Sequence, residues 1–260
     1  MLINYKNKKI FAFSDTHGMN NRLEIPEDVD ILICCGDCTR DDMSDEEIID
    51  FLKWYTQLPG RYKIFVPGNH DMLFETEPER AKLHFPTSVT LLEDCGVIID
   101  DIYFFGVTCR PWRFENSEYD LPKEVDFLIT HAPAKGHLDN NTGCEILKQM
   151  INEGKPKYYI FGHIHELGLQ QEVTPDTTYL NVSYYNHLLH HHTMHKSLEL
   201  ENSGRRLKLS SIKIVCNYGK AISKRDFGEA RTPPTNDNQR FDTTFISCLS
   251  RIDKKTRKKV

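Results

Sequence analysis

A chain of 260 residues, 39% of them hydrophobic and 27% charged, is long enough to bury one sizeable core, with or without an appendage. No apolar run approaches the roughly 20 residues that a membrane-spanning helix needs, and the start of the chain lacks the features of a signal peptide. The eight cysteines are scattered rather than arranged as a disulfide framework, so we expect reduced thiols in a cytoplasmic protein.

The net charge of −5 hides an asymmetry along the chain. Residues 1–186 contain 17 Lys and Arg against 31 Asp and Glu, whereas residues 187–260 contain 16 against 7. We therefore predict one domain at 1–186 and a His-rich, basic C-terminal extension at 187–260. The extension fits a disordered end, or a segment that docks on nucleic acid or on the acidic body.

Strands and helices are expected to alternate in the acidic part of the chain. Apolar runs predict the first strands at 9–13, 29–35 and 62–66, because unbroken β-branched or bulky residues are typical of strands buried on both faces. A capping box at 44–47 begins a helix that runs to about Gln57, and a second helix is expected at 77–83.

The second half of this part continues the alternation. Strands are expected at 89–92, at 97–107 as a hairpin, and at 125–130, 158–161 and 178–183, with a helix at 143–152. In the extension we expect one strand, at 211–216. The order of strands and helices predicts an α/β domain whose strands are at least partly parallel.

Side chains able to bind a metal ion follow nearly every predicted strand. They are Asp15 and His17, Asp37, Asn69 and His70, His131, and His163 and His165. In open α/β sheets, sites form at the carboxyl ends of strands. Oxygen and nitrogen donors without thiolate suit Mn²⁺, Fe or Zn²⁺ and argue against a structural zinc site. The set is too large for one ion, and two ions about 3.5–4 Å apart serve in-line displacement at phosphorus.

Five blocks of sequence together resemble the signature of the calcineurin-like metallophosphoesterases. They are Asp15-Thr16-His17, Gly36-Asp37, Gly68-Asn69-His70-Asp71, His131 and Gly162-His163-Ile164-His165. The stretches 130–139, 143–144 and 161–166 are similar to the small, single-domain phosphodiesterase-like branch of that family. The resemblance covers about residues 10–185. It implies a four-layer α/β/β/α sandwich with the active site along one edge of the paired sheets.

The resemblance also implies a role for each residue of the blocks. It assigns Asp15, His17 and His165 to one divalent ion, Asn69, His131 and His163 to a second, and Asp37 to a bridge between them. His70 would reach the leaving-group or a phosphoryl oxygen, and Asp71 would orient the His70 imidazole. The implied reaction is in-line attack on phosphorus by a metal-bridging hydroxide.

The sequence leaves several activities open. A phosphodiesterase fits best, a phosphomonoesterase acting on a small metabolite or nucleotide shares the site, and a nuclease or a non-catalytic metal-binding scaffold fits less well. Asp37 is followed by Cys38-Thr39-Arg40 rather than by the Asp-Arg-Gly of the protein Ser/Thr phosphatases, which argues against a phosphoprotein substrate. We expect a small phosphoester as the partner and no membrane; nucleic acid is a possible but not a favoured partner, and the sequence leaves the oligomeric state open.

Two arginines are further candidates for contact with substrate. Arg110 lies in a loop after a predicted strand and suits bidentate binding of phosphate, although a surface turn that buries Trp112 fits this loop equally well. Arg40 follows the predicted bridging residue closely, and an exposed loop arginine is the simpler interpretation.

Overall fold

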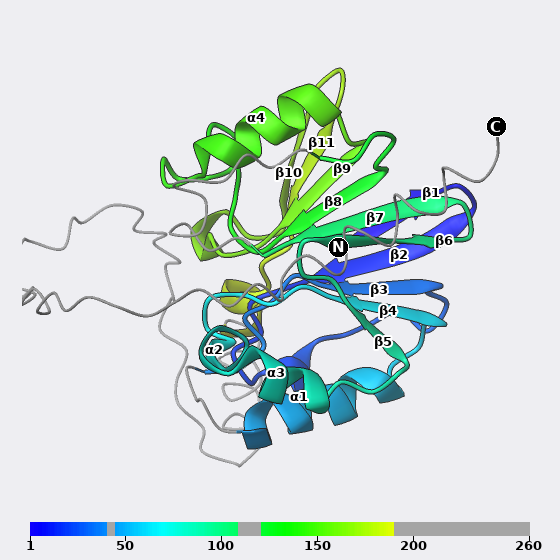
Figure 1. Ribbon diagram of the computed structural model, residues 1–260, viewed down its shortest axis with the longest axis vertical. Helices are drawn as coiled ribbons and strands as arrows, with labels where there is room; N and C mark the ends of the chain where they lie inside the picture. The colour runs from blue at the N-terminus through cyan, green and yellow to red at the C-terminus, as the bar shows by residue number, and fades with distance from the viewer. Residues whose placement is uncertain (41–44, 109–120, 190–260) are drawn as a thin grey trace, which may run out of the picture. The chain divides into compact units, whose positions relative to one another are not determined.

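The computed structural model describes residues 1–40, 45–108 and 121–189 (Figure 1). The chain divides into two compact units, Met1–Lys196 and Ser197–Val260, and the second unit lies outside the described residues. Arg110, Trp112 and the strand expected at 211–216 also lie outside them, as does almost all of the basic extension.

The described residues form two β-sheets, with the strand orders β1-β2-β3-β4-β5 and β10-β11-β9-β8-β7-β6. The first sheet contains β1 (Leu2–Tyr5), β2 (Lys8–Phe13), β3 (Ile31–Cys34), β4 (Tyr62–Phe65) and β5 (Val89–Leu91). The second contains β6 (Cys95–Ile99), β7 (Ile102–Val107), β8 (Phe127–Thr130), β9 (Tyr158–Phe161), β10 (Gln170–Val173) and β11 (Thr178–Asn181).

Both sheets have a parallel centre, with one antiparallel edge strand in the first sheet and two in the second. Strands β2 to β5 pair in parallel, and β1 adds to them antiparallel. In the second sheet β11, β9, β8 and β7 are parallel, while β10 and β6 are antiparallel. Because parallel neighbours end on the same side, the residues that follow the central strands of each sheet gather at one edge.

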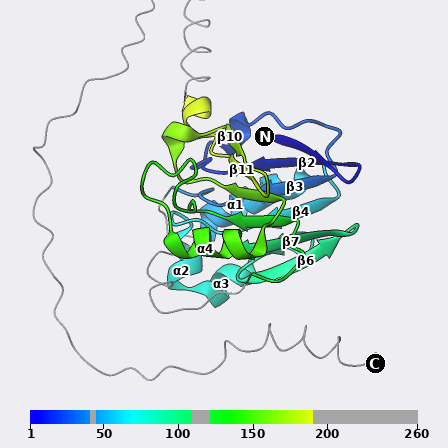
Figure 2. The same ribbon diagram turned by 90° about the horizontal axis from the view of Figure 1, so that it is seen from above.

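Helices cover the outer faces of the two sheets. They are α1 (Asp45–Gln57), α2 (Met72–Thr76), α3 (Pro78–Leu83) and α4 (Glu145–Gly154). Figure 1 shows α1, α2 and α3 beside the first sheet and α4 beside the second, with the two sheets facing each other. Figure 2 shows the same elements from above. The expected α/β/β/α layering is therefore confirmed for the described residues.

Three buried apolar clusters hold these layers together. The first lies between the sheets and includes Ile33 of β3 and Phe104 of β7. The second joins the first sheet to α1 through residues such as Phe51, and the third joins the second sheet to α4 through residues such as Leu147. Each sheet is thus apolar on both faces, as its unbroken apolar strands predicted.

Every strand predicted in the described residues is present. Among the elements that were not predicted are the edge strands β1 and β10, the short helix α2, and two 3-10 turns at Asn20–Arg22 and His165–Leu167. The domain also continues past Asn186, where we placed its end, because residues 185–189 are helical and the side chain of Leu188 is fully buried. The basic composition begins before the packed core ends, so charge alone misplaced this boundary.

Candidate metal centre

The loops that follow β2 and β3 are joined to each other by backbone hydrogen bonds. The N–H of Asp15 donates to the carbonyl of Gly36 at 3.0 Å, and the N–H of His17 donates to the carbonyl of Asp37 at 3.0 Å. Left-handed backbone, which non-glycine residues seldom adopt, occurs at Asp15 (φ 56°), His17 (φ 42°), Asp37 (φ 54°) and His163 (φ 68°). Such strain concentrates at functional sites, where the surrounding structure enforces it.

Asp15, His17 and His165 form one group of side chains that could hold an ion, with their ligand atoms within 4.8 Å of one another. Nε2 of His165 lies 3.1 Å from Oδ1 of Asp15 and 3.4 Å from Nε2 of His17. Asp15 is fully buried, and its carboxylate also accepts hydrogen bonds from the Ser14 hydroxyl and the N–H of His163. The geometry assembles the first predicted ligand set.

Asp37, His131 and His163 form the second group, again with ligand atoms within 4.8 Å. Oδ2 of Asp37 lies 3.1 Å from Nε2 of His131, and both side chains are 1% exposed. The same oxygen lies 3.9 Å from Nε2 of His17, which belongs to the first group. Asp37 therefore stands between the two groups, where the sequence predicted a bridging carboxylate.

Two buried polar atoms support metal binding here. Among the described residues, Oδ1 of Asn69 is buried and forms no hydrogen bond, and the buried Nε2 of His131 faces only the carboxylate of Asp37, with which it pairs only while the imidazole is protonated. Burying a polar atom without a partner is costly, so such atoms call for an explanation. A divalent ion held by Asn69, Asp37, His131 and His163 would satisfy both, and their oxygen and nitrogen donors suit it.

The ring of His131 is oriented by a hydrogen bond on its other side. Its Nδ1 lies 2.7 Å from the carbonyl oxygen of Cys35, which fixes the N–H on Nδ1 and directs Nε2 toward Asp37. Burial lowers the pKa of His131, but the facing carboxylates of Asp37 and Asp15 outweigh burial and raise the pKa to about 10. In the metal-free protein His131 thus carries a proton that an incoming ion must displace.

Four other ligands, His17, His163, Asp15 and Asp37, are in the ionisation state that binds metals. Burial lowers the pKa of His17 and of His163, so both imidazoles are neutral at pH 7. Burial alone would raise the pKa of Asp15, but its hydrogen bond with His165 and the charge of His131 lower it. For Asp37 burial again raises the pKa, but the charge and hydrogen bond of His131 and the N–H of His70 together outweigh burial and lower it.

Close backbone approach explains two of the glycines in the sequence blocks. A Cβ on Gly162 would overlap the Ser14 hydroxyl and the Asp15 carboxylate, and a Cβ on Gly68 would overlap the carboxylate of Asp37. Only glycine lets these loops pass so close to the ligand groups.

Asp71 has different contacts from those expected. Its buried carboxylate accepts hydrogen bonds from the backbone N–H of Gly68 (2.8 Å), Asp37 (2.9 Å), Cys38 (3.0 Å) and Thr39 (3.2 Å). Within the described part of the chain no hydrogen bond joins it to the His70 imidazole, so the expected orienting role is corrected. Asp71 instead ties the loop after β3 to the loop after β4.

The His70 imidazole lies at the rim of the candidate centre. Its Nε2 is 4.0 Å from Oδ2 of Asp37, and its side chain is 35% exposed where that of Asp37 is 1% exposed. Thr39, to which the sequence assigned no role, donates a 2.7 Å hydrogen bond to the His70 carbonyl and so fixes its backbone. The expected contact of His70 with substrate remains a prediction.

Arg40 holds the loop after β2, which contains Asp15 and His17. Its Nε donates to the carbonyl of His17 at 3.2 Å, and its backbone N–H donates to Glu47 at 2.7 Å. The interpretation of Arg40 as an exposed loop residue therefore gains support over a contact with substrate. Its side chain also has a structural role, because it binds the backbone of His17.

Several residues around the centre carried no recognisable signal in the sequence. The side chain of Asn181 donates to the carbonyl of Ile164 at 2.8 Å, and that of Asn186 donates to the carbonyl of His165 at 2.8 Å. Both asparagines hold the loop between His163 and His165. No local pattern could identify them, because the contacts depend on how β11 and the residues after it return to the site.

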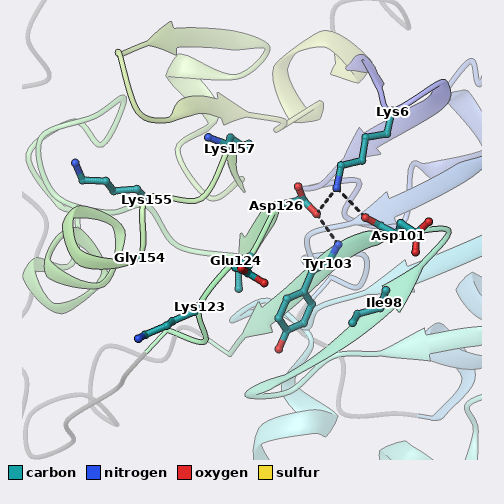
Figure 3. A pocket seen from close by; sticks show the side chains of 11 residues that line it. Lys6, Ile98, Asp101, Tyr103, Lys123, Glu124, Asp126, Gly154, Lys155 and Lys157 are labelled. Carbon is teal, nitrogen blue, oxygen red and sulfur yellow. Dashed lines mark hydrogen bonds and ion pairs between the residues drawn. The ribbon is translucent and has the colours of Figure 1, made fainter. Parts of the chain in front are cut away.

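A hollow of about 720 Å³ opens at the opposite ends of the strands (Figure 3). Asp126, which lines it, directly precedes β8, whereas His131 directly follows β8. Asp126 accepts a 2.8 Å hydrogen bond from the N–H of Tyr103 and forms a 3.1 Å ion pair with Lys6. These groups satisfy one another and lie away from the candidate metal residues.

Comparison with known proteins agrees with this geometry. The sequence pattern of the calcineurin-like phosphoesterase family matches residues 8–167, more than half of the chain. The chain belongs to this family. It therefore carries a metallophosphoesterase domain, a hydrolase acting on phosphoester bonds. The resemblance drawn from the sequence blocks is confirmed at the level of the family.

Relatives cover most of the domain. UPF0046 protein K07C11.7 of Caenorhabditis elegans is 33% identical over 208 residues, which span 68% of this chain and 70% of the nematode protein. Metallophosphoesterase domain-containing protein 1 of Homo sapiens is 30% identical over 218 residues, 67% of this chain and 65% of the human protein. A solved crystal structure with 15% identity and a TM-score of 0.50 covers 70% of this chain and 90% of that chain, which supports the fold.

None of the helices in the described residues combines the length and the apolar character needed to cross a membrane.

Proposed function

We propose that this phosphoesterase is a phosphodiesterase that works with two divalent ions. The observation that carries the proposal is the position of Asp37, whose Oδ2 lies within 3.1 Å of His131 in one ligand group and 3.9 Å of His17 in the other. Asp15, His17 and His165 would hold one ion, Asn69, His131 and His163 the other, and Asp37 both.

The ions would lower the pKa of bound water and neutralise charge on the phosphoryl oxygens. The chain's own residues hold the reacting groups in place. Asp15 and Asp37, with lowered pKa values, bring negative charge into a buried site, which favours cations over neutral ligands. Mn²⁺, Fe and Zn²⁺ all suit the donor atoms, and we propose Mn²⁺ for the first tests.

His70 is proposed to act on the substrate rather than on the ions. Its imidazole stands beside His17, with ring centroids 4.8 Å apart, and is more exposed than the ligand side chains. From this position Nε2 can donate a hydrogen bond to the leaving-group oxygen or to a phosphoryl oxygen as the bond to phosphorus breaks. Asp71 supports this geometry through the backbone of the loops after β3 and β4.

Hydrolysis of two chromogenic esters tests the proposal. The metal-loaded protein should hydrolyse bis(p-nitrophenyl) phosphate with a higher kcat/KM than p-nitrophenyl phosphate. The reverse order would replace the diesterase by a phosphomonoesterase that uses the same site. Absence of turnover on either ester and on a wider phosphoester panel, with ions bound, would favour the non-catalytic scaffold.

A small phosphoester remains the proposed substrate, and a nuclease is the less favoured alternative. Residues 1–186 are strongly acidic in sum, with 17 Lys and Arg against 31 Asp and Glu. This net negative charge disfavours binding of the phosphate backbone of a nucleic acid. Hydrolysis of single- or double-stranded DNA that falls steeply with added salt would reverse this preference.

A further inference from the structure

Residues 183–188 return to the candidate metal centre after β11 has ended. The N–H of Tyr184 donates to the carbonyl of Ser14 at 3.1 Å, and Leu188 is buried in the cluster between the first sheet and its helices. Of the three residues between these anchors, Tyr185 and Asn186 are thereby fixed against the loop of His163–His165. Neither residue belongs to the ligand groups, and neither belongs to the sequence blocks of the family.

Tyr185 contacts both imidazoles of one ligand group. Its ring centroid lies 4.3 Å from that of His165, at an interplanar angle of 31°, and 5.0 Å from that of His17, at 77°. Among the described residues its hydroxyl forms no hydrogen bond that would hold it elsewhere, so the ring carries these contacts. One aromatic side chain thus limits the rotation of two ligands at once.

Asn186 holds the same group from the backbone side. Its Nδ2 donates a 2.8 Å hydrogen bond to the carbonyl oxygen of His165. His165 is therefore restrained at its ring by Tyr185 and at its backbone by Asn186. In the described part of the chain no ring contact or hydrogen bond links Tyr185 or Asn186 to the second group, Asp37, His131 and His163.

We propose that Tyr185 and Asn186 are positioning residues for the half of the metal centre formed by Asp15, His17 and His165. Nε2 of His17 and Nε2 of His165 lie 3.4 Å apart, close enough to share one ion, and a ligand pair fixed in this way loses little freedom when the ion binds. The inference rests on the dinuclear centre proposed above. It predicts that loss of Tyr185 or Asn186 lowers the affinity for one of the two ions and not for the other.

Titration of Mn²⁺ into the metal-free, full-length protein tests the proposal, with calorimetry for the affinities and EPR for the two bound ions. Tyr185→Leu should lower the affinity for one Mn²⁺ ion by about tenfold or more and leave the affinity for the other unchanged. Removal of such supporting contacts costs about 10–100-fold in metal affinity. Asn186→Ala should weaken the same ion, and His165→Ala identifies which ion that is. Tyr185→Phe keeps the ring and should bind both ions as the wild type does.

Tyr179→Leu is the matched control. Tyr179 stacks on His137 with ring centroids 3.9 Å apart, and His137 is not in either ligand group. Loss of this tyrosine should change the melting temperature but not the affinity for either ion.

Three results would overturn the inference. The first is wild-type affinity for both ions in Tyr185→Leu and Asn186→Ala. The second is an equal loss of affinity for both ions in these variants, and the third is the same loss of affinity in Tyr179→Leu. A wild-type protein that binds fewer than two ions would instead refute the dinuclear centre itself, so the two failures are distinguishable.

Discussion

The buried carboxylate of Asp71 accepts a 2.9 Å hydrogen bond from the backbone N–H of Asp37, the residue that stands between the two ligand groups. The same carboxylate accepts a 2.8 Å hydrogen bond from the N–H of Gly68. A residue expected to act on its neighbour His70 thus acts on the loop of Asp37 instead. The position of the proposed bridge thus depends on a buried carboxylate that belongs to neither ligand group.

Asp71→Asn should destabilise the fold as well as the site. The amide group of asparagine would face backbone N–H groups that now donate to a carboxylate, and leaving buried groups unsatisfied costs about 1–3 kcal/mol. Urea denaturation should show this loss, together with reduced hydrolysis. Asp176→Asn, which alters only an exposed ion pair with Lys155, is the control. Lost activity at unchanged stability would restore the role of Asp71 as a partner of His70.

His70→Ala should reduce turnover without removing the ions. The imidazole is more exposed than the ligand side chains and is proposed to assist the leaving oxygen, a contribution of about 10²–10⁴-fold. Steady-state rates on the diester and Mn²⁺ stoichiometry should be measured on the same sample, with His137→Ala as the control histidine. Turnover near that of the wild type would remove His70 from the mechanism.

Metal binding should release protons because of His131. The pKa of this imidazole is raised to about 10 in the metal-free protein, so it is protonated at pH 7.5 and must lose a proton to bind an ion. Affinity should therefore rise as the pH is raised toward 10. Calorimetry in two buffers of different ionisation enthalpy should give at least one proton released per chain, and His137→Gln should give the same number. Zero protons would contradict the assigned ionisation state.

Gly162→Ala should weaken binding of the ion proposed at Asp15. The added Cβ would overlap the Asp15 carboxylate and the Ser14 hydroxyl, and forced overpacking costs about 1–3 kcal/mol. Mn²⁺ titration and thermal denaturation measure both effects. In Gly136→Ala the added Cβ meets no atom within 4 Å, so this variant tests the loss of a left-handed glycine without a clash and should keep both ions. Equal behaviour of the two variants would refute the packing argument.

The central strands and the ligand residues could be predicted from the sequence because both depend on local patterns. Strand β3 is an unbroken apolar run, and Asp37 follows it within three residues. Strand β10 escaped prediction because Gln170, Gln171 and Glu172 are polar residues on an exposed edge. Its pairing with β11 stabilises it, and an apolar pattern does not reveal that pairing.

Supporting contacts were harder to predict than ligands. Asp71 follows His70 directly, which suggested a local pair, yet its hydrogen bonds reach residues 37–39, more than 30 positions away. Tyr185 meets His17 only because the chain returns to the first sheet after β11. Such contacts depend on how the layers close, so no spacing within one segment encodes them.

Simultaneous measurement of bound Mn²⁺ and of bis(p-nitrophenyl) phosphate hydrolysis tests the dinuclear centre at Asp37 most directly. Activity should appear as the second ion binds, with two ions per chain at saturation. Asp37→Asn should lose tight binding of at least one ion and reduce turnover by orders of magnitude. Full turnover with one ion or with excess chelator, or near-wild-type activity in Asp37→Asn, would contradict the proposed centre.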